Sequence, residues 1–567
     1  MTLSHCWGGI NPLTTTNATL LQRRREIPFK SLPKTFQDAV TITRSLGVKY
    51  LWIDSLCIIQ DDRDDWVREA ARMKDIYANC YAMISADGSA NPNGGCFSSG
   101  INEQSRSFAV HSVGPFHSKV TAFVRLTRLR DPFHAEVGHI IGDTTGPLAA
   151  SQSRSALNRR GWCFQERVLA PRILHLGPSE LAWECPETVA CECRDVITSH
   201  DRESRFKAFF ADRILRDAQR PCDNQHAHAR QQVNILLWMH FVEEFTRREL
   251  TNSTDMLHAL SGLAEFMGAA TQTDYLCGLW KRNLAELLLW HIDDSDKRIR
   301  SLDPTLRTPR PFTVKSPGQL WSQTERASGA NTNTDTGTGA TLAKRHATYY
   351  APSWSWASVI GPISFQIGRL DTVKRDQFPH VRKDGMLEMA KARHSLLERV
   401  DAHYTTDPLN RYGPPKSPAS LTIRGPTVLA SWTGERDAAH PLARHGGGQI
   451  LTYIDASPGT ASISTADFTL DPLGKETLGI SIGAELLLLG TILDDKASVP
   501  QENDGAVWGV QIPSVIGIVL ARGAPFPTHD LLTDQSAERS VYRRVGLFRA
   551  NADEWGRIGR MRTVVIM

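Results

Sequence analysis

Acidic side chains crowd one stretch of this sequence, KYLWIDSLCIIQDDRDDWVREAARMKDIYANCYAMISA, which spans residues 49–86. Its pattern predicts a strand over residues 49–54, a loop, a helix that begins near Asp64, and a second strand. Open α/β sheets bind ligands in the crevice beyond the carboxyl ends of their strands. Asp54 closes the first strand, and Glu69 follows one loop and one helical turn later. These two carboxylates are therefore the candidates for chemistry.

A purely structural interpretation of the same acids stays open. Asp54 would then bind a loop amide or cap a helix, and its neighbours would cap the start of the next helix in contact with solvent. These neighbours are Asp61, Asp62, Asp64 and Asp65.

The helix that carries Glu69 is the best-patterned element of the chain. At about 100° per residue, its apolar side chains fall within about 40° of one line along the helix. They are Trp66, Ala70, Met73, Tyr77 and Cys80. Glu69 lies about 60° from that line. It therefore borders the buried stripe, where a carboxylate is partly desolvated and still able to reach a cleft.

The elements that must position these residues alternate along the first 90 residues. TLSHCWG reads as a short strand that ends at Gly8, residues 31–47 as a helix with Pro33 near its start, and the strand of Asp54 follows. Alternating strands and helices indicate an α/β domain with a parallel or mixed sheet. Further along, RILHL and LAWEC flank GPSE as a predicted hairpin.

A chain of 567 residues is longer than a single domain with one hydrophobic core usually is, so several domains are expected. We expect an α/β domain over residues 1–195 and a helical region over residues 196–326. A low-complexity polar linker or insertion is predicted over residues 327–345. Strand-like segments separated by turn residues predict a β-rich, mostly antiparallel region over residues 346–567.

Charge and hydropathy exclude several classes of function. The 65 Lys and Arg residues against 61 Asp and Glu residues leave a net charge of +4 without a basic block, so no nucleic-acid partner is expected. The longest apolar run, LGISIGAELLLLGTIL, is shorter than a membrane-spanning helix and contains Glu485, so no membrane partner is expected. The first 30 residues lack a secretory signal. We therefore expect a cytoplasmic protein with reduced cysteines.

The sequence lacks the motifs of several other common kinds of catalytic or metal site. Cys185, Cys191 and Cys193 lie close together, but they do not form paired Cys-x-x-Cys hooks for zinc, so no metal site is expected. His5 and Cys6 are adjacent on a strand and would point to opposite faces, which argues against a catalytic dyad. The sequence has neither a P-loop nor a Gly-x-Gly-x-x-Gly turn after a strand, so no bound nucleotide cofactor is expected.

Several long motifs occur in the order found in the heterokaryon incompatibility (HET) domain proteins of filamentous fungi. They are LSHCWGG, LPKTFQDAV, LGVKYLWIDSLCIIQDDRDDWVREAARMKDIYANC, RGWCFQERVLAPRIL and LAWEC within residues 1–195, and YLCGLWKRNLAELLLWH and APSWSWAS beyond them. The chain therefore resembles this family. The resemblance implies an effector of fungal non-self recognition and programmed cell death. Its implied partners are other incompatibility proteins, NLR-type proteins and further copies of the chain.

HET domains are in turn remotely similar to Toll/interleukin-1 receptor (TIR) domains, which implies a TIR-like parallel sheet flanked by helices. Some TIR domains hydrolyse NAD with a glutamate on the corresponding helix, and Glu69 occupies the matching position in this sequence. The resemblance thus implies NAD as a substrate, Glu69 as the catalytic residue, and Trp7, Gly8, Asp54 and Trp66 as substrate-binding residues. Enzymatic TIR domains commonly place the Trp and Glu four residues apart, whereas Trp66 and Glu69 are three apart. Two non-enzymatic alternatives stay open: a self-associating signalling module and an inactive family member.

Overall fold

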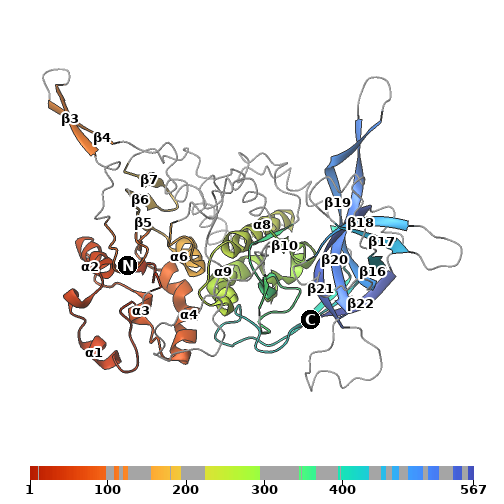
Figure 1. The fold of residues 1–567 in the computed structure, drawn as a ribbon, viewed down its shortest axis with the longest axis horizontal. Coiled ribbons are helices and arrows are strands. Elements are labelled where there is room, and N and C mark those ends of the chain that lie inside the picture. Colours follow the sequence, from red (N-terminus) through yellow and green to blue (C-terminus); the bar gives the residue numbers. More distant parts are fainter. Residues whose placement is uncertain are drawn as a thin grey trace, which may run out of the picture.

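The computed structural model describes most of the first 97 residues, the middle of the chain and the strands of its C-terminal part. The described residues are 1–9, 12–97, 107–113, 119–125, 155–178, 180–192, 224–293, 344–346, 348–365, 394–395, 397–432, 449–454, 463–470, 483–501, 508–522, 541–551 and 560–567. Residues 1–97 lie at one end of the molecule, the helices of residues 224–271 in the middle, and the C-terminal strands at the other end (Figure 1).

The N-terminal part contains a mixed five-stranded sheet with the strand order β1-β2-β5-β6-β7. The strands are β1 (Thr2–Ser4), β2 (Met83–Ser85), β5 (Ile173–Leu176), β6 (Leu181–Glu184) and β7 (Val189–Cys191). The pairs β1–β2 and β2–β5 are parallel, whereas β5–β6 and β6–β7 are antiparallel. The predicted α/β class is therefore confirmed, and so is the hairpin of RILHL and LAWEC.

Five of the described helices accompany this sheet, and α2 and α4 lie where the sequence periodicity predicts them. The five are α1 (Leu20–Arg25), α2 (Lys34–Ser45), α3 (Asp54–Cys57), α4 (Arg63–Ala78) and α6 (Gly161–Leu169). Helix α2 buries Phe36 completely, and Gly47 follows its end with a φ of +69°. At the start of α4, the Asp62 side chain accepts hydrogen bonds from the backbone N–H groups of Asp64 and Asp65. This N-cap satisfies two of the donors that a helix start leaves free.

The predicted strand over residues 49–54 is wrong, because only Trp52 pairs with β1, as an isolated parallel bridge. The Leu3 N–H donates to the Trp52 carbonyl oxygen over 2.9 Å, and the Trp52 N–H donates to the Met1 carbonyl oxygen over 3.0 Å. The pairing ends there because the chain turns into α3 at Asp54. Asp54 still lies at the carboxyl edge of the sheet, as the first residue of a helix.

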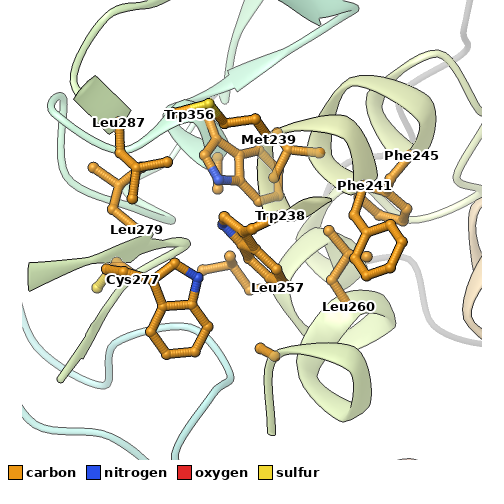
Figure 2. Close-up of a cluster of buried hydrophobic side chains, with 14 of the residues drawn as sticks. Trp238, Met239, Phe241, Phe245, Leu257, Leu260, Cys277, Leu279, Leu287 and Trp356 are labelled. Carbon is orange, nitrogen blue, oxygen red and sulfur yellow. The ribbon is translucent and has the colours of Figure 1, made fainter. Parts of the chain in front are cut away.

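The middle of the chain consists of α8 (Asn224–Thr246), α9 (Met256–Thr271) and the short α10 (Leu284–Leu287). Figure 2 shows apolar side chains that α8 and α9 contribute to one cluster: Trp238, Phe241, Phe245, Leu257 and Leu260. The same buried cluster includes Phe164 and Ile173 from the N-terminal part and Trp356 from the C-terminal part. A continuous hydrophobic core therefore connects the N-terminal sheet and helices to the rest of the chain.

The C-terminal part forms a nine-stranded sheet in the order β14-β19-β20-β21-β18-β17-β16-β15, with β22 paired to β16 and β21. Its strands are β14 (His394–Ser395), β15 (Arg399–His403), β16 (Ser420–Trp432), β17 (Gln449–Ile454), β18 (Ile463–Leu470), β19 (Gly483–Gln501), β20 (Trp508–Arg522), β21 (Val541–Asn551) and β22 (Arg560–Ile566). The predicted antiparallel β region is confirmed, with β21–β22 as the parallel exception. Most of the predicted linker, residues 327–343, lies outside the described residues.

Short antiparallel strand pairs complete the described structure. They are β3 (Ser107–Val113) with β4 (Lys119–Arg125), β8 (Tyr275–Leu276) with β9 (Leu279–Trp280), β10 (Trp290–Ile292) with β13 (Ile363–Phe365), and β11 (Lys344–Arg345) with β12 (Val359–Ile360). None of the described helices has the length and apolar character needed to cross a membrane.

Candidate functional site

An indole and a carboxylate meet at the carboxyl edge of β1. Trp7 follows this strand, and its Nε1–H donates to Oδ2 of Asp54 over 3.1 Å. Trp7 is half-buried and the Asp54 side chain is 24% exposed, so both residues remain within reach of solvent. The structure thus brings together two of the predicted site residues. An aromatic face beside a carboxylate suits a ligand that carries both a ring and hydroxyl groups.

The buried side chain of His5 lies next to Asp54. Its Nδ1 is 3.7 Å from Oδ1 of Asp54, and its side chain is 2% exposed. Burial lowers the pKa of His5, Asp54 raises it and Arg160 lowers it further, so that the net shift is downward and the ring is neutral at pH 7. Its Nε2 is buried and finds no hydrogen-bond partner among the described residues. A neutral imidazole with an unpaired nitrogen is able to take up a proton.

Glu166 brings a second carboxyl group to the same place from α6. Its Oε2 accepts a hydrogen bond from Oγ of Ser4 over 2.5 Å. Burial raises the pKa of Glu166 to about 7, and Asp54 raises it as well, whereas hydrogen bonds from Ser4 and Tyr77 and the charge of Arg160 act in the opposite direction. A carboxyl group with this pKa exchanges its proton near neutral pH, as general acid–base catalysis requires.

Arg160 supplies a positive charge to these carboxyl groups. Its guanidinium donates to the His5 carbonyl oxygen. Burial would lower the pKa of Arg160, but the charges of Cys163, Asp54 and Glu166 raise it, so the guanidinium stays charged. We call the assembled residues the β1-edge cluster: Ser4, His5, Trp7, Asp54, Tyr77, Arg160 and Glu166.

Gly8, another predicted site residue, lets the chain after Trp7 pass close to the loop after β2. Its φ is +61°, and a Cβ at this position would lie 2.4 Å from the carbonyl oxygen of Ala90 and 2.4 Å from Cβ of Asn91. Gly8 therefore has a structural role at the edge of the β1-edge cluster.

Gly8→Ala is expected to lower the free energy of unfolding by about 2–3 kcal/mol, because it adds a backbone clash to left-handed strain. Gly9 offers a matched control, since its φ is +72° and nothing lies within 4 Å of an added Cβ. Gly9→Ala should cost only about 1 kcal/mol, from the strain alone. Urea unfolding of both variants measures the difference, and equal losses would contradict the packing role of Gly8.

The other two predicted site residues lie apart from this cluster. Oε1 of Glu69 accepts a hydrogen bond from Arg72 over 2.8 Å, and the Glu69 side chain is 13% exposed. No hydrogen bond or ion pair joins Glu69 to the β1-edge cluster in the part of the chain that the structure describes. The Trp66 ring faces the helical middle of the chain, 5.5 Å from the ring of His258. The catalytic role of Glu69 stays a prediction.

Sequence reasoning missed Ser4, Arg160 and Glu166 and set His5 aside. One signal could have found Glu166. The helix GWCFQERVL is mostly apolar and yet carries the consecutive polar residues Gln165, Glu166 and Arg167, all of which are buried. Consecutive polar residues on a buried helix need partners on several sides, which indicates a polar network.

A second buried network adjoins the β1-edge cluster through Arg167. Nδ1 of His175 is 2.9 Å from Oδ2 of Asp87, and its Nε2 is 2.9 Å from Oε2 of Glu184. Arg167 donates to the same Glu184 oxygen over 3.1 Å, and Asn158 donates to Asp87 over 3.1 Å. Burial would lower the pKa of His175, but Asp87 and the hydrogen bonds to both carboxylates raise it. Arg167 and the imidazole thus face two buried carboxylates, which is typical of a structural network.

Within the described residues, no group of three or more His, Cys, Asp or Glu side chains is arranged to hold a metal ion.

Comparison with known proteins identifies the family to which the N-terminal part belongs. Residues 1–166 match the family model described as Heterokaryon incompatibility protein (HET). Neither the curated proteins nor the solved structures give a match. The matched range covers the whole β1-edge cluster, from Ser4 to Glu166. The chain is therefore a protein with a heterokaryon incompatibility domain.

Proposed function

We propose that the chain is an effector of non-self recognition and cell death, and that its HET domain hydrolyses the bond between nicotinamide and ribose in NAD. One observation carries the proposal: the accessible carboxylate of the Trp7–Asp54 pair is close enough to the buried Glu166 to raise its pKa. A ring-binding surface, an anion and a group with a pKa of about 7 are what this reaction needs. The motif similarity to TIR domains that hydrolyse NAD supports the same substrate.

Breaking the bond requires stabilisation of positive charge on the ribose. The bond from carbon to the pyridinium nitrogen breaks, and its electron pair moves to that nitrogen, so nicotinamide leaves as a neutral molecule without a general acid. The ribose carbon then has oxocarbenium character, which the Asp54 carboxylate would stabilise. Trp7 would stack on a ring of the substrate.

Water then adds to the ribose carbon and must lose a proton. With a pKa of about 7, roughly half of the Glu166 population is ionised at pH 7 and able to accept that proton. The Ser4 hydroxyl, 2.5 Å from Glu166, is placed to relay it. The products are nicotinamide, ADP-ribose and one proton.

Nicotinamide release by the purified full-length chain, alone and after forced oligomerisation, tests the proposal. Asp54→Asn is expected to lower release at least about tenfold, because it removes the anion nearest to the accessible indole. Glu69→Gln should retain at least half of the parental rate, because this carboxylate is engaged by Arg72. The opposite pattern, with Glu69→Gln inactive and Asp54→Asn active, would assign the catalytic role to Glu69.

A specific observation also favours a non-catalytic, self-associating module. The HET domain exposes large apolar side chains, among them Leu21 (74% exposed), Tyr50 (82%) and Tyr81 (58%). Exposed apolar side chains suit docking of a second copy or of another incompatibility or NLR-type protein. Concentration-dependent association without nicotinamide release in either state would favour this module. Overexpression in a fungal host, with cell death as the readout, tests the effector role and would expose an inactive member.

A further inference from the structure

Helix α6 connects the β1-edge cluster to the helical middle of the chain and packs against both α4 and α9 (Figure 1). The residues that lead into α6 pair with the segment after α8. The Gly161 N–H donates to the Glu249 carbonyl oxygen over 2.7 Å, and the Glu249 N–H donates to the Arg159 carbonyl oxygen over 2.6 Å. Arg248 also donates to the Asn158 carbonyl oxygen, over 2.5 Å. The start of α6 is therefore fixed to the end of α8.

Apolar contacts hold α6 in place without setting its rotation. Phe164 packs against Phe241 and Phe245 of α8, with ring centroids 5.9 and 6.5 Å apart. Figure 2 shows these two α8 rings close to Leu260 of α9. Hydrophobic packing is non-directional and tolerates a small rotation of a helix about its axis. A directional contact is needed to fix that rotation.

Gln165 supplies such a contact toward α9, in addition to the one that Arg167 makes with β6. Its Oε1 accepts hydrogen bonds from the backbone N–H groups of Gly262, over 2.8 Å, and of Leu263, over 3.3 Å, both inside α9. A Cβ at position 262 would lie 2.8 Å from the same oxygen and 2.6 Å from Cβ of Lys74. The glycine thus leaves room for the contact. Gln165 itself is 1% exposed, so water does not replace α9 as its partner.

The direction of Gln165 sets the direction of Glu166, because consecutive helix side chains point about 100° apart. With Gln165 on α9, Glu166 points to a different side of α6 and reaches Ser4. We propose that Gln165 is a positioning residue through which α9 holds Glu166 in the β1-edge cluster. Displacement of α9 would then withdraw Glu166 from Ser4. This inference rests on the proposed function for its activity readout alone.

Variants of the full-length chain separate positioning from general stability. Gln165→Leu removes the acceptor, and Gly262→Ala crowds the same contact from α9. Val168→Ala is the control, because Val168 is 2% exposed on the same helix and contributes apolar packing only. The first two variants are expected to lower kcat for nicotinamide release at least about tenfold, with KM within about twofold of the parent. Val168→Ala should keep kcat within about twofold, and equal losses in all three would overturn the proposal.

The pH dependence of unfolding is a second readout that needs no NAD. Glu166 is faced by Ser4, by Tyr77 from α4, by Asp54 from α3 and by Arg160. Its raised pKa makes the parent less stable at pH 8 than at pH 5. Gln165→Leu and Gly262→Ala should reduce this difference by turning Glu166 toward solvent, and Val168→Ala should keep it. An unchanged difference in the first two variants would refute the positioning role, whereas a parent chain without nicotinamide release would refute the proposed function alone.

Discussion

A Glu166→Gln variant is expected to be more stable than the parent chain at pH 8 and no more stable at pH 5. Burial raises the pKa of Glu166 from its ordinary 4.5 to about 7. Between these values the folded carboxyl keeps a proton that the unfolded carboxyl has lost, so stability falls as the pH rises through this window. About one pH unit above 7 the folded chain bears nearly the full cost of the buried charge, about 3–4 kcal/mol at about 1.4 kcal/mol per pKa unit. Glutamine has no charge to bury, and its oxygen still accepts from Ser4.

Urea unfolding at pH 5 and pH 8 measures this effect, with Glu69→Gln as the control. The Glu69 carboxylate pairs with the exposed Arg72, so its loss should change stability by less than about 1 kcal/mol at either pH. As the proposed proton acceptor, Glu166 should also be needed for nicotinamide release, which is expected to fall at least about a hundredfold. A gain in stability with a loss of activity is typical of a functional group held in an unfavourable environment. A variant less stable than the parent at pH 8 would contradict this account.

The helices near the site could be predicted because their signals are local. Helix α4 shows its buried face through apolar spacing, and a run of acids marks its start, where Asp62 forms the cap. Helix α2 buries Phe36 on the predicted face and is followed by Gly47. Each of these signals depends on residues within a few positions of one another, so no knowledge of distant contacts is required.

The strand predicted over residues 49–54 shows where local signals fail. Of its apolar residues, Ile53 is 3% exposed, whereas Leu51 and Trp52 are only half-buried. Strand assignment depends also on how far the chain stays extended beside its partner, and here the chain turns into α3 at Asp54. Trp52 therefore makes a single bridge before α3 begins. Hydrophobicity indicates burial, whereas the length of a ladder depends on both strands staying extended.

The candidate site could be predicted only in part for the same reason. Asp54 follows from the rule that ligands bind beyond the carboxyl ends of strands, and Trp7 is implied by the resemblance to TIR domains. The position of Glu69 at the border of a buried stripe also fits its small exposed fraction, but its neighbour Arg72 engages the carboxylate. Glu166 lies far along the chain and reaches β1 only because α6 packs between the sheet and the helical middle. A local sequence pattern cannot predict such long-range packing.

His175→Gln is expected to lower the free energy of unfolding by about 3–5 kcal/mol at pH 6, because it breaks a buried charge network and leaves Asp87 without its imidazolium partner. The net shift in the pKa of His175 is upward, since Asp87 and the two hydrogen bonds outweigh burial. The stabilisation from the charged ring is therefore complete below the ordinary pKa of about 6.5 and is lost as the pH rises through the folded value. The effect of the substitution should accordingly shrink between pH 6 and pH 9.

Urea unfolding across this pH range, with His403→Gln as the matched control, measures the contribution of His175. His403 is an exposed residue of β15, so its substitution should cost less than about 0.5 kcal/mol at every pH. A loss at His175 that grows as the pH rises would contradict the charged ring, because a neutral imidazole contributes no cation that deprotonation could remove.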